Sequence, residues 1–416
     1  MKNLALVMVL MVAVSGALLA QDEEAVEGTK GSVTDAVTLP FMFSFVPGVS
    51  IPPRPGAVPV INNLHFGYLG NYCNTLEGFG MSGVLDIVQG EMRGGQVSGV
   101  ANLVISDLKV SLDEPWSYGS SEGCQVAGIL NLAAGSNPTW FQVAGLANGQ
   151  LGDMNGAQFA GLGNCSFGGL SGAQIAGLGN AHVGNIEGVQ VAGLGNAAIG
   201  DLSGAQVSAL GNVLIGKVSG AQVGLFNFAM DVDGAQVGLF NINLGGELYV
   251  DVGYDELNML TVSIRHGTKY FYNYYSAGLQ TDSFDASLSF PYFGKSSQSL
   301  GMGARYPFSD LLAAFLEIGI TSVAATNSES WDVMHGASPE DRFMNVLELR
   351  AQIYTARLGI NYTLGQYLSL VAGVSYNLSM PTDKNRALLP APLLGRFPWS
   401  NDTYVQWPGF YVAMRF

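Results

Sequence analysis

Charged side chains are scarce in this sequence. Only 12% of its 416 residues are Asp, Glu, Lys or Arg, about half the share found in an ordinary globular chain. Acidic residues dominate, with 32 Asp and Glu against 17 Lys and Arg, which gives a formal net charge of −15. Such a chain has no general electrostatic attraction for phosphates. We therefore expect no nucleic-acid partner.

Cysteine and histidine are also rare. Three cysteines, Cys73, Cys124 and Cys165, are too few for a disulfide framework in a chain of this length. The four histidines are not paired at metal-ligand spacing, and the many Gly-x-Gly patterns lack the Lys-Ser/Thr of a phosphate loop. We expect Cys165 to be a small buried residue and His182 to lie at a solvent-facing or turn position. We predict no catalytic, metal or cofactor-binding residue, no cofactor, and no enzyme activity.

Beyond the first twenty residues the sequence has no run of 18 apolar residues, which excludes a later spanning helix. If the protein enters a membrane it must do so as a closed barrel. Residues 1–20 combine Lys2, the apolar run Leu4–Val14 and small residues up to Ala20. This pattern predicts a cleaved secretory signal peptide, the alternative being a membrane anchor. Residues 21–38 form an acidic leader.

Glycine, by contrast, is abundant, with 56 residues, and it belongs to a repeat. The motif Gly-x-Gln-φ-x-Gly-Leu-x-Asn recurs in steps of 16, and about ten units fill residues 76–245. The regular part of the glutamine series is Gln142, Gln158, Gln174, Gln190, Gln206 and Gln222. The asparagine series, six residues later each time, is Asn148, Asn164, Asn180, Asn196 and Asn212.

Large apolar residues within each unit are spaced by three, five, three and five residues, as in Phe159, Leu162, Phe167 and Leu170. This spacing fits two short strands joined by glycine-rich corners, and it predicts a β-solenoid of about ten 16-residue coils. Membrane hairpins are the alternative, but 16 residues are too few for two spanning strands of about 9–11 residues each. Stacked amides would form hydrogen-bonded ladders; a ligand-reading face is the other possibility. Which columns face inward stays open.

After residue 245 the repeat disappears, and segments of alternating apolar and small polar residues follow. The expected strands are Leu257–His266, Thr268–Leu279, Ser299–Tyr306, Leu312–Ala324, Leu347–Tyr362, Tyr367–Leu378 and Pro408–Phe416. Such segments are typical of outer-membrane barrels. We predict an antiparallel barrel of 8–10 strands from residues 246–416 and from further strands in residues 39–75. A soluble β-sandwich is the alternative. In the last strand, Phe410, Val412, Met414 and Phe416 form the barrel signature.

Three features together resemble a known family. They are the segment Leu39–Gly48 followed by Asn62–Leu64, the 16-residue repeat, and the closing segment Trp407–Phe416. This combination is similar to bacterial surface-repeat-containing proteins of the cell envelope. The resemblance covers most of the chain and implies an envelope or surface location. It implies no activity, so no functional residue is carried over.

The sequence thus predicts an all-β, non-enzymatic protein at the outer membrane or cell surface of a diderm bacterium. The barrel would present the solenoid or be plugged by it, in a structural or partner-binding role. Expected partners are outer-membrane lipid, the barrel-assembly machinery implied by the C-terminal strand, and an unknown surface ligand. The alternatives are a small pore or transporter with a solenoid plug, and a soluble periplasmic solenoid.

Overall fold

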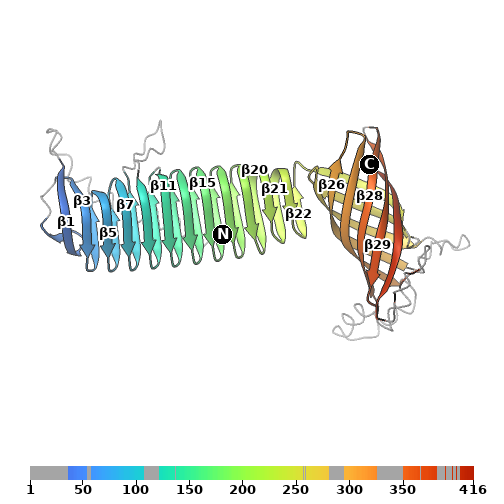
Figure 1. Ribbon diagram of the computed structural model, residues 1–416, viewed down its shortest axis with the longest axis horizontal. Helices are drawn as coiled ribbons and strands as arrows, with labels where there is room; N and C mark the ends of the chain where they lie inside the picture. The colour runs from blue at the N-terminus through green and yellow to red at the C-terminus, as the bar shows by residue number, and fades with distance from the viewer. Residues whose placement is uncertain are drawn as a thin grey trace, which may run out of the picture.

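The structure is a computed structural model that describes residues 36–53, 58–106, 121–135, 137–255, 257, 259–280, 295–325, 350–365, 367–381, 389, 396, 400 and 403–416. The predicted signal peptide, and the leader up to residue 35, lie outside these residues. The described residues form an all-β chain with a rod at one end and a barrel at the other (Figure 1). Among them, no helix has the length and apolar character needed to cross a membrane.

The rod is a β-solenoid of about ten turns, in which each turn contributes two short strands. Equivalent strands of successive coils pair in parallel and in register, so that Gln158 lies opposite Gln174 and Asn164 opposite Asn180. The rod strands are β1 (Val37–Val46), β2 (Val49–Ile51), β3 (Val60–Gly67), β4 (Gly70–Cys73), β5 (Thr75–Ser82), β6 (Leu85–Val88), β7 (Met92–Ser98), β8 (Ala101–Ile105), β9 (Glu122–Ala127), β10 (Leu130–Ala134), β11 (Asn137–Ala144), β12 (Ala147–Leu151), β13 (Met154–Ala160), β14 (Gly163–Phe167), β15 (Leu170–Ala176), β16 (Gly179–Val183), β17 (Ile186–Ala192), β18 (Gly195–Ile199), β19 (Leu202–Ser208), β20 (Gly211–Val223), β21 (Phe226–Val237) and β22 (Phe240–Asn243).

The N-terminal strands belong to the rod. β1 pairs in parallel with β3, and β3 pairs in parallel with β5, which continues the ladder. β2 folds back antiparallel on β1 at the far end of the rod, where it covers part of an otherwise open sheet edge. The prediction that residues 39–75 contribute barrel strands is therefore wrong. These coils keep inward amides, such as the fully buried Asn62 and Asn71, although their sequence lacks the full repeat motif.

The barrel is closed by eight antiparallel strands, each paired with its neighbour in sequence. The last strand pairs with both the first and the seventh, which closes the sheet without a free edge. Seven of these strands correspond to the strands predicted from the sequence, and the additional one is β23, the first of the barrel. The strands are β23 (Glu247–Asp255), β24 (Met259–Gly267), β25 (Phe271–Gln280), β26 (Lys295–Pro307), β27 (Leu312–Ala325), β28 (Arg350–Gly365), β29 (Leu368–Ser379) and β30 (Val405–Arg415).

The interior of the rod combines buried amides with a cluster of buried apolar residues that includes Leu170, Ile186 and Leu202. Both repeating amide columns are buried, and only one of the four apolar columns points inward, at Leu170, Ile186 and their equivalents. The other apolar columns face outward, so that Leu178 is 47% exposed and Ile199 51%. Glycine two residues before most of the ladder glutamines brings the coils together. At Gly188, φ is +147°, and a Cβ would lie 1.9 Å from the carbonyl oxygen of Gly172 in the previous coil.

Candidate functional site

The glutamines form one continuous hydrogen-bonded ladder along the rod. Each Nε2 donates to the Oε1 of the glutamine in the preceding coil, as from Gln158 to Gln142 (2.6 Å) and from Gln190 to Gln174 (2.7 Å). The ladder contains the predicted set and extends it to Gln96 at one end and Gln236 at the other. Within the ladder each amide nitrogen has a partner in the preceding coil, which compensates the cost of burying these polar groups.

The asparagines form a second ladder that runs in the opposite direction. Each Nδ2 donates to the Oδ1 of the asparagine in the following coil, as from Asn148 to Asn164 (2.9 Å) and from Asn180 to Asn196 (2.8 Å). The same Nδ2 also donates to a backbone carbonyl of the next coil, such as Val191 O from Asn180 (2.9 Å). The last bond leaves the rod, because Asn241 donates to Asn273 of the barrel strand β25. This ladder therefore joins the two parts.

A buried carboxylate stands at the N-terminal end of the glutamine ladder. Gln96 Nε2 donates to Asp86 Oδ1 at 3.2 Å, and His65 Nε2 lies 3.0 Å from the same oxygen. All three side chains are fully buried. Since the ladder donates toward this end, Asp86 supplies a charged acceptor where the chain of amide dipoles terminates, and charge-assisted bonds of this kind are among the stronger ones.

Two single residues differ from their predicted positions. His182 is 3% exposed instead of solvent-facing, because it occupies an inward column beside Ser166, whose Oγ lies 2.6 Å from His182 Nδ1. Burial lowers the pKa of His182 to about 4. Cys165 is half-buried on an outer face, opposite Gly149 and Ala181, and not in the core.

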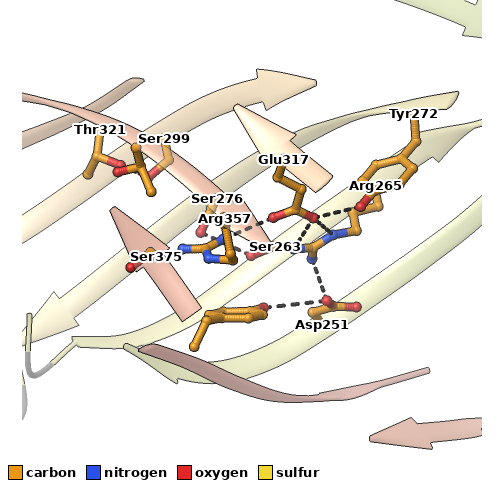
Figure 2. Close-up of polar contacts among 12 residues, drawn as sticks. Asp251, Ser263, Arg265, Tyr272, Ser276, Ser299, Glu317, Thr321, Arg357 and Ser375 are labelled. Carbon is orange, nitrogen blue, oxygen red and sulfur yellow. Dashed lines mark hydrogen bonds and ion pairs between the residues drawn. The ribbon is translucent and has the colours of Figure 1, made fainter. Parts of the chain in front are cut away.

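The barrel lumen holds a cluster of buried charges (Figure 2). Glu317 lies between two arginines: Arg265 Nε donates to its Oε1 at 3.0 Å, and Arg357 Nη1 donates to its Oε2 at 3.0 Å. Arg265 also donates to Asp251, which accepts from Arg415 Nε at 2.8 Å. Five charged side chains from β23, β24, β27, β28 and β30 are thereby tied into one network across the lumen.

Aromatic rings pack around this network and help to fill the lumen. Tyr272 donates to Glu317 Oε1 at 2.8 Å, and the guanidinium of Arg357 lies 4.3 Å from the ring centre of Tyr411. Towards the other end of the lumen, where β27 and β28 meet their long connection, an apolar cluster includes Trp407 and Ile353, which are at most 1% exposed. An eight-stranded barrel is narrow enough for side chains to fill, and these residues do so.

The outer wall of the barrel is apolar. Inward and outward residues alternate, so that Asp251, Arg265 and Glu317 point inward while their chain neighbours point outward. The signature residues Val412, Met414 and Phe416 lie on the outer wall, with 47–54% exposure, and Phe410 shares their face. The most exposed apolar side chains of the wall include Leu260, Val262, Ile264, Leu300, Leu316, Ile318, Ile320, Leu358, Ile360, Leu370 and Val374.

The sequence identified the ladder residues but not the buried charges of the barrel. Within the predicted strands, Arg265, Glu317 and Arg357 are isolated charges among alternating residues, and each lies at the inward position. The alternation of inward and outward positions along each strand is the signal that could have identified these three charged residues. No group of His, Cys, Asp and Glu that could hold a metal ion occurs among the described residues.

Comparisons with known proteins add little. No protein-family model matches the chain, and neither does any curated protein. Among solved structures, a designed transmembrane β-barrel matches with 13% sequence identity and a TM-score of 0.20, over 41% of this chain and 91% of that chain. A likeness with so low a TM-score carries no argument, and the inferences below rest on the residues themselves.

Proposed function

We propose that this chain is a non-enzymatic outer-membrane protein whose barrel anchors the solenoid rod at the membrane of a diderm bacterium. The rod then serves a structural or partner-binding role. This proposal agrees with the resemblance to bacterial surface-repeat proteins. It also includes export by the predicted signal peptide and recognition of the C-terminal strand by the barrel-assembly machinery.

The inside-out distribution of side chains in the barrel is the observation that carries the proposal. Charged residues such as Arg265 and Glu317 are at most 1% exposed, while the outward Leu358 and Val374 are 58% and 65% exposed. In water this arrangement would leave a closed apolar wall in contact with solvent. In a bilayer the same wall meets hydrocarbon, and closure satisfies every backbone group of the sheet.

The packed lumen favours an anchor over a pore. The network around Glu317 and the apolar cluster around Trp407 occupy the interior of an eight-stranded barrel. The rod lies outside the barrel, beside it (Figure 1), so the expectation that the solenoid plugs the lumen is wrong.

Membrane fractionation combined with gel mobility before and after boiling tests the proposal. We expect extraction only by detergent, and a mobility shift on boiling that reports a folded barrel. Leu358→Arg on the outer wall should prevent insertion, because a cation in the middle of the lipid-facing wall costs about 2–4 kcal/mol. Lys217→Arg, on the exposed surface of the rod, is the matched control and should insert normally.

Two results would refute the anchor. Release of the protein by carbonate, without a mobility shift, would make residues 247–415 a soluble β-domain. Steady single-channel conductance from the unmodified protein in planar bilayers would make the barrel a pore, because the side chains around Glu317 would then have to leave a water path.

A further inference from the structure

One edge of the rod is an unbroken apolar ridge. At the corner that follows the first strand of each coil, a single large apolar residue points outward. The backbone N–H of this residue, or of the next one, donates to the carbonyl oxygen of the corresponding apolar residue in the preceding coil, as from Leu178 to Leu162. We call this set the apolar edge; all its members are 37–53% exposed. It consists of Leu69, Val84, Val100, Ile129, Leu146, Leu162, Leu178, Leu194, Leu210, Leu225 and Leu239.

The opposite edge has polar corners, which follow a second outward apolar column that includes Val183, Ile199 and Ile215. Asp153, Asn185 and Asp201 occupy its corners, and their side-chain oxygens accept from the backbone amide of the next coil at 2.6–3.0 Å. Between residues 121 and 245 all seven charged side chains lie at or beside this edge, namely Glu122, Asp153, Glu187, Asp201, Lys217, Asp231 and Asp233. The charged side chains of this part of the rod are therefore confined to one edge, and the apolar edge, which carries none, is about 50 Å long at the usual spacing of stacked strands.

The apolar edge runs onto the outer wall of the barrel. Its last members, Leu225 and Leu239, line a hollow of about 720 Å³, and on the far side of this hollow lie Leu300, Ile318 and Tyr376 of the barrel wall. These three residues are 42–54% exposed and belong to the face that the proposed function places in lipid. The apolar edge and the barrel wall thus form one continuous apolar surface, which is concave at the corner where the rod meets the barrel.

The contacts that hold the rod on the barrel set this corner. Asn273 Nδ2 donates to Gly238 O at 3.0 Å, and Tyr275 Oη donates to Leu239 O at 3.1 Å. Thr268 Oγ1 donates to Gly234 O at 3.0 Å. The polar groups of the junction are therefore bonded to one another, and the side chains that face the hollow are mainly apolar.

We propose that the apolar edge contacts the phospholipid acyl chains of the leaflet that surrounds the barrel, and that these chains fill the hollow at the corner. The inference rests on the proposed membrane location of the barrel. The occupant is lipid because the apolar edge continues a lipid-facing wall and all charged side chains between residues 121 and 245 stand on the opposite edge. Exposed apolar surface of this extent marks a contact with another apolar surface.

Tryptophan fluorescence in vesicles whose phospholipids carry bromine on their acyl chains tests the proposal. Leu178→Trp places the probe on the apolar edge, Asn185→Trp places it on the polar edge of the same coil, and Leu358→Trp places it on the barrel wall. Quenching is measured beyond that of the unmodified protein, and the mobility shift on boiling checks the fold of each variant. Leu194→Trp is the second edge probe if the first does not fold.

We expect the Leu178→Trp probe to be quenched at least half as strongly as the Leu358→Trp probe, and the Asn185→Trp probe to be unaffected. If the wall probe is quenched while the edge probe behaves like Asn185→Trp, the edge does not contact lipid and the barrel anchor still stands. If the wall probe is not quenched either, the proposed function fails. An edge probe shielded from both brominated lipid and aqueous acrylamide would show a second copy of the chain on the ridge, which would also overturn the proposal.

Discussion

Replacing one glutamine of the ladder by leucine should destabilise the rod, although the position is fully buried. In Gln190→Leu, Gln206 Nε2 loses its acceptor at 2.8 Å and Gln174 Oε1 loses its donor at 2.7 Å. Each buried polar atom left unsatisfied costs about 1–3 kcal/mol. Burial of the leucine offsets about 2 kcal/mol, so mid-range values leave a net destabilisation of about 2 kcal/mol.

Urea unfolding of the full-length protein in detergent micelles, followed by far-ultraviolet circular dichroism, measures this loss. With an m-value of about 2 kcal/mol/M, the midpoint of the rod transition should fall by about 1 M. Val189→Ala is the matched control on the same strand, because the adjacent coils already carry Ala173 and Ala205 at this position. A midpoint for Gln190→Leu at or above that of the unmodified protein would refute the reasoning.

Double variants separate a ladder from an ordinary core. Gln190→Leu with Gln206→Leu leaves only two ladder atoms without their ladder partner, Gln174 Oε1 and Gln222 Nε2, the same number as either single change, because the bond between the two replaced residues disappears from both sides. Gln190→Leu with Gln222→Leu leaves four. We therefore expect the adjacent pair to cost little more than one substitution and the separated pair to cost the sum. Equal costs for the two pairs would contradict a ladder.

Three further predictions concern other positions. Gly188→Ala should lower the urea midpoint of the rod more than Gln190→Leu does. The new Cβ would lie 1.9 Å from the carbonyl oxygen of Gly172, and the positive φ of this position adds backbone strain of about 1–3 kcal/mol. Glu317→Ala should lower the heating temperature at which the folded gel band disappears, because two arginines lose a buried partner at a cost of about 3–5 kcal/mol. Ser299→Ala should leave this temperature unchanged. The pKa of His182 is lowered from 6.5 to about 4 in the folded chain, so on acidification the unfolded chain binds this proton before the folded chain does. Rod stability should therefore decrease as pH falls from 6.5 towards 4. His182→Ala, which installs the residue found at Ala198, should remove this dependence.

The repeat made much of the rod predictable. A constant step of 16 residues with two apolar positions on either side of each corner requires two strands per coil, and in-register stacking then places Gln158 opposite Gln174. The direction in which the side chains point could not be read in the same way. Amide and apolar columns alternate with equal regularity, and the general tendency of leucine to be buried would have placed Leu178 inside, whereas it is 47% exposed.

The first coils and the first barrel strand were misread for a different reason. Residues 39–75 lack the full repeat motif, so their strand-like character alone predicts barrel strands. In the structure β1 and β3 pair in parallel, which the antiparallel barrel does not allow. In β23, apolar residues occupy the outward positions, but the inward positions include the charged residues Glu247, Asp251 and Asp255. A charge inside a strand counts against burial unless a partner is known, and Arg265 and Arg415, the partners of Asp251, come from other strands.

In both the rod and the barrel, polar side chains lie inside and apolar side chains face outward, and the amide ladders explain how the rod maintains this arrangement. An apolar column tolerates small shifts of its side chains, because one aliphatic contact replaces another at little cost. An amide column does not, since Gln190 meets both of its partners only when three coils are aligned. Register is thus specified by polar groups inside, which leaves the apolar residues free to face outward. The lumen of the barrel is organised in the same way around Arg265 and Glu317. Two structures of different topology in one chain therefore place hydrogen-bonded polar groups inside and apolar side chains outside, the distribution expected for the proposed membrane location.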